Sequence, residues 1–417
     1  MTDRRGQFSW CLYDWANSAF PTVIITFVFA TYFTSSVAPD KVTGTAHWGY
    51  AMSLSALAVA VVAPLFGAMA DKGGRRKPWL GFFTVLCVVL SAALWLVEPN
   101  PSFALLALVI VGLANFAFET GMVFYNAMLP GLTSQSHIGR LSGWGWGLGY
   151  FGGLLCLTLT LVGFVQPQTP WFGLDKDMAE HVRASALLVA VWYAAFALPL
   201  FLFTPEKADT GGTFWQNLKA GLGELRATFR QVRKYSDIAR FLIARMIYTD
   251  GLNTLYAFGG IYAAGSFGMD LSEIILFAIG MNVTAGLGAA AFGWVDDAIG
   301  PKKMILIALV GLTLLSSVLL VVQSKTLFWI FGLPLGLFVG PAQAASRSMM
   351  ARMAPPYLTS EMFGLFAFSG KATAFLGPAL LGAVTLAFDS QRAGMATILV
   401  FFVIGMILLI RVPETSQ

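Results

Sequence analysis

The sequence has 417 residues, of which 57% are hydrophobic and 11% are charged. This composition, with a mean hydropathy of +0.73, excludes an ordinary soluble domain and favours a membrane protein with several spans. The net charge is +5, from 26 Lys and Arg against 21 Asp and Glu. Because the basic residues lie mainly in short loops between apolar runs, they indicate membrane topology, and we expect no nucleic-acid partner.

Apolar runs recur along the whole chain. A hydrocarbon core requires about 20 apolar residues per helix, and twelve runs meet this requirement. The expected fold is therefore an all-α membrane protein with twelve transmembrane helices. The predicted spans are 10–36, 47–70, 78–97, 102–129, 140–165, 183–203, 238–266, 272–295, 303–323, 326–350, 361–387 and 392–411.

A single long polar connection, between spans six and seven, divides the chain into halves. The sequence predicts an N-terminal six-helix bundle over 1–204, a cytoplasmic linker over 205–237 and a C-terminal six-helix bundle over 238–417. Basic and apolar residues alternate in the linker, which predicts an amphipathic helix at the membrane surface. Most Lys and Arg residues fall on the side of the termini and the linker. We therefore expect both termini in the cytoplasm, with the chain in a bacterial inner membrane.

A polar pattern near the start of the chain returns in the second half. Asp14 is followed three residues later by Asn17, and Asp250 is followed three residues later by Asn253. On a helix this spacing places both side chains on one face. Each pattern opens a long apolar run, so the polar face is carried into the membrane, where ionisable residues are costly and indicate function.

A second internal repeat lies in two loops, 67–77 and 293–303. Aligned without a gap, the two loops share glycine, aspartate and basic positions, which indicates parallel repeats of six helices. The matched pairs are Gly67 with Gly293, Asp71 with Asp297, Gly74 with Gly300, Arg76 with Lys302 and Lys77 with Lys303. We expect the following residues to form gating loops that stabilise one conformation: Gly67, Asp71, Arg75, Arg76, Asp297 and Lys302.

The first loop, Gly67-x3-Asp71-x2-Gly74-Arg75-Arg76-Lys77, resembles the loop 2–3 signature of the major facilitator superfamily, and 293–303 resembles its degenerate second copy. The stretches 13–20, 124–130 and 139–150 resemble the "unknown major facilitator" family, which includes the fungal vacuolar, autophagy-related amino-acid effluxer. The resemblance implies two pseudo-symmetric six-helix bundles, alternating access and secondary transport of a small solute. The antiporter signature of span five usually ends in Gly-Pro, and its absence here removes one argument for antiport.

The resemblance also implies that spans one, four, seven and ten line a central cavity. Asp14, Glu119, Asp250 and Arg347 fall in these four spans. Glu119 lies among apolar residues that favour the neutral form of a carboxyl, and it is the predicted proton carrier. Asp14 and Asp250 are read as gate or coupling residues, although a helix N-terminus could also satisfy the carboxylate of Asp14.

Two further basic residues fall inside predicted spans. Lys371, in span eleven, could bind an anionic group or release a carboxylate. The alternative for Glu119 is a permanent structural pair with Lys371, Arg245 or Arg347. Arg245 and Asp250 are five residues apart, so we expect no direct pair between them.

Four neutral polar residues complete the candidate set. Asn17 and Asn253 could bind the carboxylate or the ammonium of a zwitterion through their amides, or hydrogen-bond a neighbouring helix. Tyr125 and Asn126 lie near the cytoplasmic end of span four and are included as substrate-binding or coupling candidates.

The predicted function is that of a secondary active transporter for a small polar solute, with an amino acid or short peptide favoured and protons as the expected coupling ion. Alternatives are a larger or anionic cargo (an organic anion, a sugar or a metal chelator), or a membrane binding or regulatory protein that does not transport. The three histidines show no metal-ligand spacing, and no phosphate loop or nucleophile motif is present. We therefore expect no enzyme activity, cofactor or metal, and a monomer surrounded by membrane lipid.

Overall fold

The computed structural model describes residues 4–206, 214–230 and 234–414. Within this part of the chain the regular structure is helical, and no strand is present. The α-helices are α1 (Arg4–Asn17), α2 (Phe29–Tyr32), α3 (Lys41–Gly73), α4 (Lys77–Ala93), α5 (Ala104–Leu132), α6 (Ile138–Thr160), α7 (Glu180–Phe203), α8 (Phe214–Arg230), α9 (Ser236–Phe267), α10 (Leu271–Ile299), α11 (Pro301–Val321), α12 (Lys325–Met353), α13 (Thr359–Lys371), α14 (Leu376–Phe388) and α15 (Gln391–Ile410).

The described residues contain eleven helical runs that are long and apolar enough to cross a membrane. The twelfth predicted span corresponds to α9, which has 32 residues and is therefore about 48 Å long at 1.5 Å per residue. Polar residues that include Arg245, Asp250 and Asn253 lower the hydropathy of this helix. The fold is thus the expected twelve-helix arrangement, with its least apolar span in the position that carries several candidate site residues.

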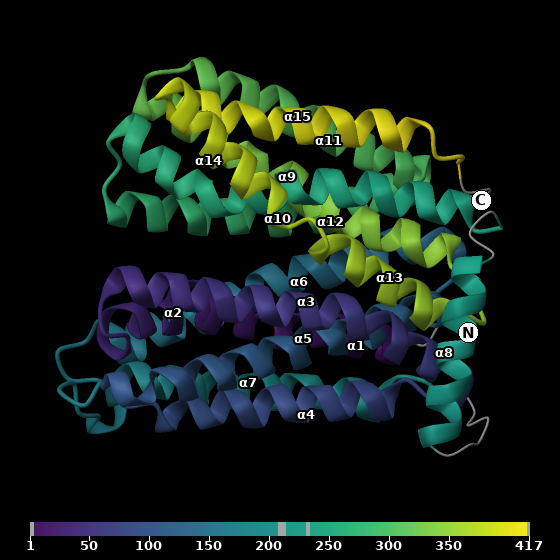
Figure 1. Cartoon of the computed structure of the whole chain (residues 1–417), viewed down its shortest axis with the longest axis horizontal. Helices are drawn as coiled ribbons and strands as arrows, with labels where there is room; N and C mark the ends of the chain where they lie inside the picture. Colours follow the sequence, from purple (N-terminus) through teal and green to yellow (C-terminus); the bar gives the residue numbers. More distant parts are fainter. Residues whose placement is uncertain (1–3, 207–213, 231–233, 415–417) are drawn as a thin grey trace.

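The helices form two groups, one above the other in Figure 1. Helices α1 to α7 form the lower group, and α9 to α12 with α14 and α15 form the upper group. Both ends of the described chain, Arg4 and Glu414, lie at the same end of the molecule, here called the terminal end. The opposite end is called the far end.

Helix α8 crosses the terminal end roughly perpendicular to the other helices (Figure 1). It packs on the end of α3, where Lys72 forms an ion pair with Glu224 at 2.6 Å. The side chains of Trp215 and Leu222 are exposed on α8. The predicted amphipathic linker helix is therefore present over Phe214–Arg230, while residues 207–213 and 231–233 of the predicted linker lie outside the described residues.

Glycines allow α6 to lie close to a helix on each side. A Cβ on Gly147 would lie 3.0 Å from Gly286 O of α10, and a Cβ on Gly149 would lie 2.8 Å from Ser18 Oγ, just after α1. The first contact joins the two groups of helices, and the second lies within the lower group. Close backbone approach through small residues is the usual way in which transmembrane helices pack.

Two predicted spans are not uninterrupted α-helices. The first continues from α1 through π-helical turns at Phe20–Phe27 and Phe33–Val37. The eleventh, predicted as one helix over 361–387, is divided into α13 and α14 by a turn over 372–375. This corrects the placement of Lys371, which ends α13 and borders the turn instead of lying within a continuous helix.

Candidate functional site

A buried ion pair joins the two groups of helices near the terminal end. Arg347 of α12 donates to Asp14 Oδ2 of α1 at 2.9 Å, and their side chains are only 2% and 7% exposed. Arg347 also donates to Ser142 Oγ of α6 at 2.9 Å and to the Ser142 carbonyl at 2.6 Å. The guanidinium of Arg347, from the upper group, is therefore held by several acceptors of the lower group at once, which is the condition under which a buried charge is tolerated.

Aromatic rings enclose this pair. The guanidinium carbon of Arg347 lies 4.8 Å from the ring centre of Trp10 and 5.6 Å from that of Trp146, within cation–π range. Trp10 stacks on Tyr125 with ring centres 4.5 Å apart, and each ring donates a hydrogen bond to the other residue's carbonyl. A Cβ on Gly145 would lie 2.6 Å from Asp14 Oδ2, so only glycine leaves room for the pair there.

Two predicted residues contact the pair only at long range. Asn17 Nδ2 lies 3.5 Å from Asp14 Oδ1 and 3.4 Å from the sulfur of Met122. Asn126 Oδ1 lies 3.4 Å from Arg347 Nη1. The structure thus places Tyr125, Asn126 and Asn17 beside the Asp14–Arg347 pair. The shorter hydrogen bonds of Arg347 go to Asp14 and Ser142.

The first of the two predicted gating loops contacts the start of α13 at the terminal end. Asp71 Oδ2 accepts from the backbone N–H of Glu361, in the first turn of α13, at 2.9 Å. Arg76 pairs with Asp71 at 3.4 Å and donates to Ser360 Oγ at 2.9 Å. A Cβ on Gly67 would overlap the backbone of Ser360. A carboxylate at a helix N-terminus is stabilised by the unpaired N–H groups and the helix dipole.

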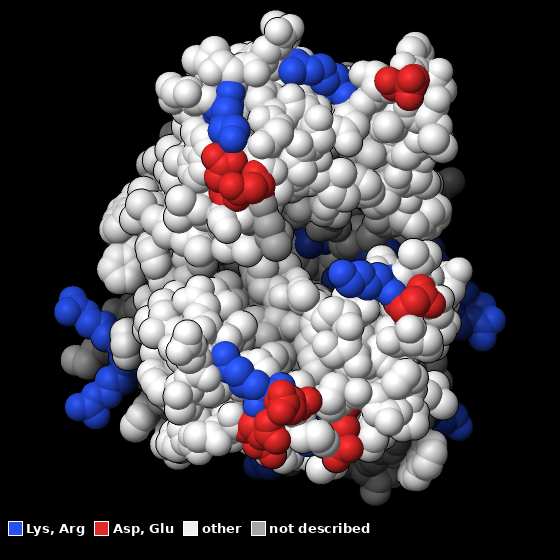
Figure 2. All heavy atoms as spheres, turned by 90° about the vertical axis from the view of Figure 1, so that its left-hand side faces the viewer, with Lys and Arg blue, Asp and Glu red and all other residues white. Residues whose placement is uncertain are grey.

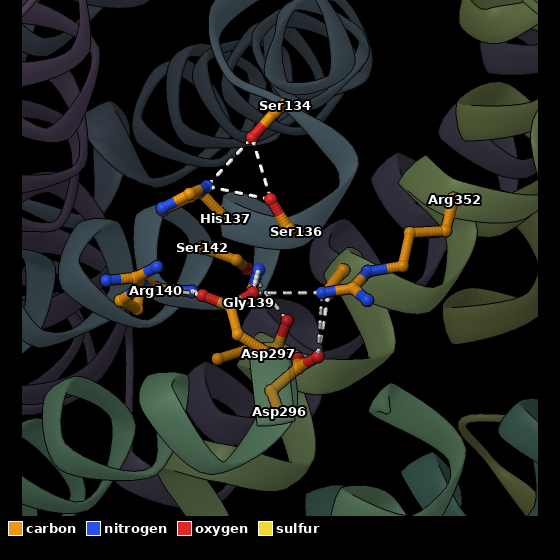
Figure 3. A network of polar contacts seen from close by, with 11 residues as sticks. Ser134, Ser136, His137, Gly139, Arg140, Ser142, Asp296, Asp297 and Arg352 are labelled. Carbon is orange, nitrogen blue, oxygen red and sulfur yellow. Dashed lines mark hydrogen bonds and ion pairs between the residues drawn. The ribbon is translucent and has the colours of Figure 1, made fainter. Parts of the chain in front are cut away.

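The second gating loop makes the equivalent contact with α6. Asp297 accepts from the backbone N–H of Gly139 at 2.8 Å and from Arg140 Nε at 2.8 Å, and Arg352 donates to it at 3.0 Å. Asp296 also pairs with Arg352, at 3.3 Å. Figure 3 shows these side chains converging below the start of α6. Each Asp thus caps a helix of the other half, as two related repeats would predict.

The remaining two loop predictions lie outside these contacts. Arg75 is exposed. Lys302 donates to the carbonyls of Ile410 and Val412 at 3.0 and 2.6 Å, within its own half. Lys302 thus holds the end of α15, whereas its counterpart Arg76 crosses between the halves.

A second ion pair joins the N-terminal and C-terminal halves of the chain near the middle of the bundle. Lys371 Nζ of α13 donates to Glu119 Oε1 of α5 at 2.7 Å. These side chains are 30% and 22% exposed, in contrast to the closed Asp14–Arg347 pair. Of the three structural partners left open for Glu119, the structure selects Lys371. The pair also brings a cation to the C-terminal end of α13, where the helix dipole favours it.

Arg245 of α9 contacts the same segment. Its Nη1 donates to the Phe366 carbonyl and to Ser369 Oγ, both at 2.7 Å, and its guanidinium lies 3.4 Å from the centre of the Phe366 ring. The Nε of Arg245 is buried and has no hydrogen-bond partner among the described residues. Arg245 therefore anchors the last turns of α13 beside Lys371 and retains one unused donor.

Asp250 belongs to α9, and its side chain contacts the start of α14. It is 1% exposed, and its Oδ2 accepts from the backbone N–H of Gly377 at 3.2 Å, while Oδ1 has no partner among the described residues. Arg245 and Asp250 do not pair, as their spacing predicts. Asn253, one turn further along α9, is exposed and does not share the environment of Asp250.

The far end is hollowed between the two groups of helices. Figure 2 views the molecule from this end and shows a depression between the upper and lower halves, with basic side-chain atoms visible deep inside. The close contacts between α6 and α10, by contrast, begin at Gly139, near the terminal end. They continue as far as Phe151, whose ring would lie 3.1 Å from a Cβ placed on Gly286. The molecule is therefore closed at its terminal end and open at its far end.

Several site residues were not predicted. Ser142 and Trp10 enclose Arg347, Ser360 and Glu361 meet the first gating loop, and Arg352 meets the second. The only sequence signal was position, because Ser142 falls in a glycine-rich stretch and Arg352 follows Arg347 by five residues. Within the described residues, no group of three or more His, Cys, Asp or Glu could hold a metal ion.

Comparison with known proteins identifies the family. A family model described as "Vacuole effluxer Atg22 like" matches residues 36–416. An uncharacterized MFS-type transporter of Bacillus subtilis, YxiO, is 27% identical over 98% of this chain and 95% of its own length. Autophagy-related protein 22 of Cryptococcus neoformans is 28% identical over 66% of this chain, which spans 50% of that protein.

Solved structures share the fold at low sequence identity. The human organic anion transporter MFSD10 aligns over 98% of this chain and 100% of its own, with a TM-score of 0.75 and 17% identity. The proton:xylose symporter XylE aligns over 100% of this chain and 97% of its own, with a TM-score of 0.74 and 12% identity. The chain therefore belongs to the Atg22-like vacuole effluxer family, and it is a multi-pass transporter of the major facilitator superfamily and not an enzyme.

Proposed function

We propose that this protein is a secondary active transporter that moves a small zwitterionic solute, an amino acid or a short peptide, by alternating access. The observation that supports this most is the Glu119–Lys371 pair. It joins α5 to α13 near the middle of the bundle and is partly exposed, and the molecule is hollowed between the two groups of helices at its far end. Substrate sites of this fold class lie at the same depth, between the two repeats.

An accessible ion pair can exchange its partners for the charges of a solute. A zwitterion offers a carboxylate to Lys371 and an ammonium to Glu119, so it can separate the two side chains without leaving either charge unpaired. A neutral sugar has no charge to offer in exchange, so separating the two side chains would leave both without a countercharge. The Asp14–Arg347 pair is too enclosed for the same exchange and acts as a closure.

The proposal includes coupling to protons, and it places the terminal end in the cytoplasm of a bacterial cell, with the chain in the inner membrane. Glu119 could take up a proton in a step in which Lys371 holds the carboxylate of the solute and the ammonium of the solute is not paired with Glu119, since the charge of Glu119 then has no countercharge. The excess of basic residues on the side of the termini supports the orientation.

A second candidate cargo is an organic anion. Two cations, Lys371 and Arg245, lie at the end of α13 against one carboxylate, Glu119, and Arg245 has an unused donor. A solute with one or two negative charges and no ammonium would satisfy this excess of positive charge. Glu119 would then lack a cationic partner and would bind a proton.

A thermal-shift screen of the detergent-purified protein tests the proposal. Amino acids, dipeptides, sugars and organic acids are added at two pH values, and ligands of the folded protein raise its Tm by mass action. We expect stabilisation by zwitterions, and its loss in Glu119→Gln and Lys371→Gln. Stabilisation by organic acids alone would favour the second cargo, and no response to any class would refute a small-solute site.

A matched pair elsewhere in the chain provides the control. Lys325 and Glu273 form an ion pair at 2.8 Å, partly exposed like Glu119–Lys371, but within one half of the molecule. Glu273→Gln and Lys325→Gln remove the same charges without touching the contact between the halves. We expect these variants to retain the full ligand-induced shift in Tm.

A further inference from the structure

The structure contains a buried carboxylate near the middle of the bundle, separate from the partly exposed Glu119–Lys371 pair. Asp250 is 1% exposed and lies in α9 at the point where the eleventh span is interrupted. One of its oxygens accepts the Gly377 N–H in the first turn of α14, and the other accepts nothing among the described residues. An ionised carboxylate is costly in a membrane when one of its oxygens accepts a single neutral hydrogen bond and the other accepts none.

No charged side chain compensates Asp250 within the described residues. Helix α9 packs against α10, α12, α13, α14 and α15, and α14 carries no charged residue. The cations on the other helices are engaged elsewhere: Arg245 on Phe366 and Ser369, Lys371 on Glu119, Arg347 on Asp14, Arg352 on Asp296 and Asp297, Lys325 on Glu273 and Arg392 on the Leu320 carbonyl.

The acidic and phenolic groups on these elements are placed as follows. Tyr248 of α9 shares a hydrogen bond with Ser346, Tyr256 shares one with Tyr150, and Tyr262 donates to the Leu319 carbonyl. Glu361 of α13 lies at the terminal end, one helix length from the turn, and Asp237 pairs with Arg240. No hydrogen bond or ion pair joins any of these groups to Asp250 within the described residues.

We propose that Asp250 binds a proton in the conformation described here, and that this proton is released when α14 moves away from α9 and exposes the carboxyl. The proposal rests on the transport function above, and it assigns a coupling proton to a residue other than Glu119. The neutral carboxyl gives up one hydrogen bond in its buried position, whereas the ionised form would bury an uncompensated charge.

The turn over 372–375 links the protonation of Asp250 to the movement of α14. It separates α13, which is held to the lower group through Lys371, from α14, which is held to α9 through Gly377. Discontinuous helices of this kind supply ion and substrate sites in other transporters. An ionised Asp250 needs water or further donors, so deprotonation favours a conformation in which α14 and α9 have separated.

Infrared spectroscopy of the purified protein tests the proton directly, without any solute. At pH 7 the wild-type protein should show the C=O stretch of a protonated carboxyl that is missing in Asp250→Asn and shifted in Asp250→Glu. Glu119→Gln should retain this component. A wild-type spectrum identical to that of Asp250→Asn in this region would overturn the proposal, because Asp250 would then be ionised.

Two further arms keep the test decisive. If Asp250→Asn does not fold, Asp250→Glu and wild-type protein labelled with carbon-13 at aspartate carboxyls identify the same component by its shift. Loss of the component on addition of sodium chloride, but not of choline chloride, would assign the site to a sodium ion and overturn the proton assignment. A protonated Asp250 in a protein that responds to no solute would refute the proposed transport function alone.

The conformational consequence has its own measurement. Ala344 of α12 is buried near the closed terminal end, and its carbonyl accepts from Ser142 Oγ of α6, where the two groups of helices meet, so an Ala344→Cys thiol reports opening of that end. Its reaction rate, divided by the rate of the same thiol in denatured protein, should rise with pH by up to about tenfold per unit, the limit for release of one proton. In Asp250→Asn this pH dependence should be absent, and an unchanged dependence would contradict the mechanism.

Discussion

Loss of the buried carboxylate at the terminal end should open the molecule there. Asp14→Asn removes the negative charge but keeps the side-chain shape, and it leaves Arg347 with Ser142 as its principal hydrogen-bond partner. Breaking a buried ion pair by removing one partner costs about 3–5 kcal/mol. Because Arg347 keeps the Ser142 bonds, at 2.9 and 2.6 Å, we expect the lower end of this range.

A cost of about 3 kcal/mol changes the equilibrium between closed and open forms more than about 100-fold, since 1.4 kcal/mol corresponds to tenfold. The Ala344→Cys thiol measures this change in detergent, because its reaction rate scales with the open fraction when opening is fast. The natural cysteines Cys11, Cys87 and Cys156 are all buried and unpaired, so the closed protein gives a low background.

The control is an ion pair of the same chemistry at an exposed position. Arg240 and Asp237 are 3.2 Å apart, and their side chains are 56% and 48% exposed. Exposed pairs contribute about 0–1 kcal/mol, so Asp237→Asn should change the thiol reaction less than about fivefold. Equal rates in Asp14→Asn and Asp237→Asn would refute the view that the Asp14–Arg347 pair holds the terminal end closed.

The same thiol reporter tests two further contacts. Gly145→Ala would place a Cβ 2.6 Å from Asp14 Oδ2, so we expect faster reaction, whereas Gly49→Ala, with no atom within 4 Å of its Cβ, should react as the wild type does. Asp297→Asn weakens the acceptor for Gly139 and Arg352 and should raise the rate more than about tenfold, at about 1.5–3 kcal/mol for bonds to a charged group. Unchanged rates in Gly145→Ala or Asp297→Asn would show that these contacts do not stabilise the closed end.

Most of the fold could be predicted from hydropathy and from the repeated loops. Each span needs a run of apolar residues of fixed length, and the two Gly-x3-Asp loops repeat at equivalent points of the two halves. The interruption of span eleven was missed because 361–387 is apolar enough overall to be taken as one span, although Ser369, Gly370 and Lys371 directly precede the turn. A turn inside protein can use the donors and acceptors of neighbouring helices, so it need not end the apolar run that hydropathy detects.

The candidate residues could be predicted individually, but not their pairings. An ionisable residue inside an apolar run must have a partner, and Glu119 had three possible cations. Lys371 is the partner because α5 packs against α13, and the two paired residues are 252 positions apart in the sequence. Ser142 was missed because a serine in a glycine-rich helix carries no signal until Arg347, 205 residues away, is placed beside it.

The most direct test of the account asks whether Glu119 and Lys371 bind opposite charges of one solute. The amino acid that stabilises the protein most is compared with its N-acetyl derivative, which lacks the ammonium, and with its amide, which lacks the carboxylate. In wild-type protein both derivatives should bind at least about tenfold more weakly. Glu119→Gln should lose the preference for the ammonium alone, and Lys371→Gln the preference for the carboxylate alone. If both variants discriminate between the three compounds as the wild type does, the solute does not bind at this pair, and the proposed substrate site is wrong.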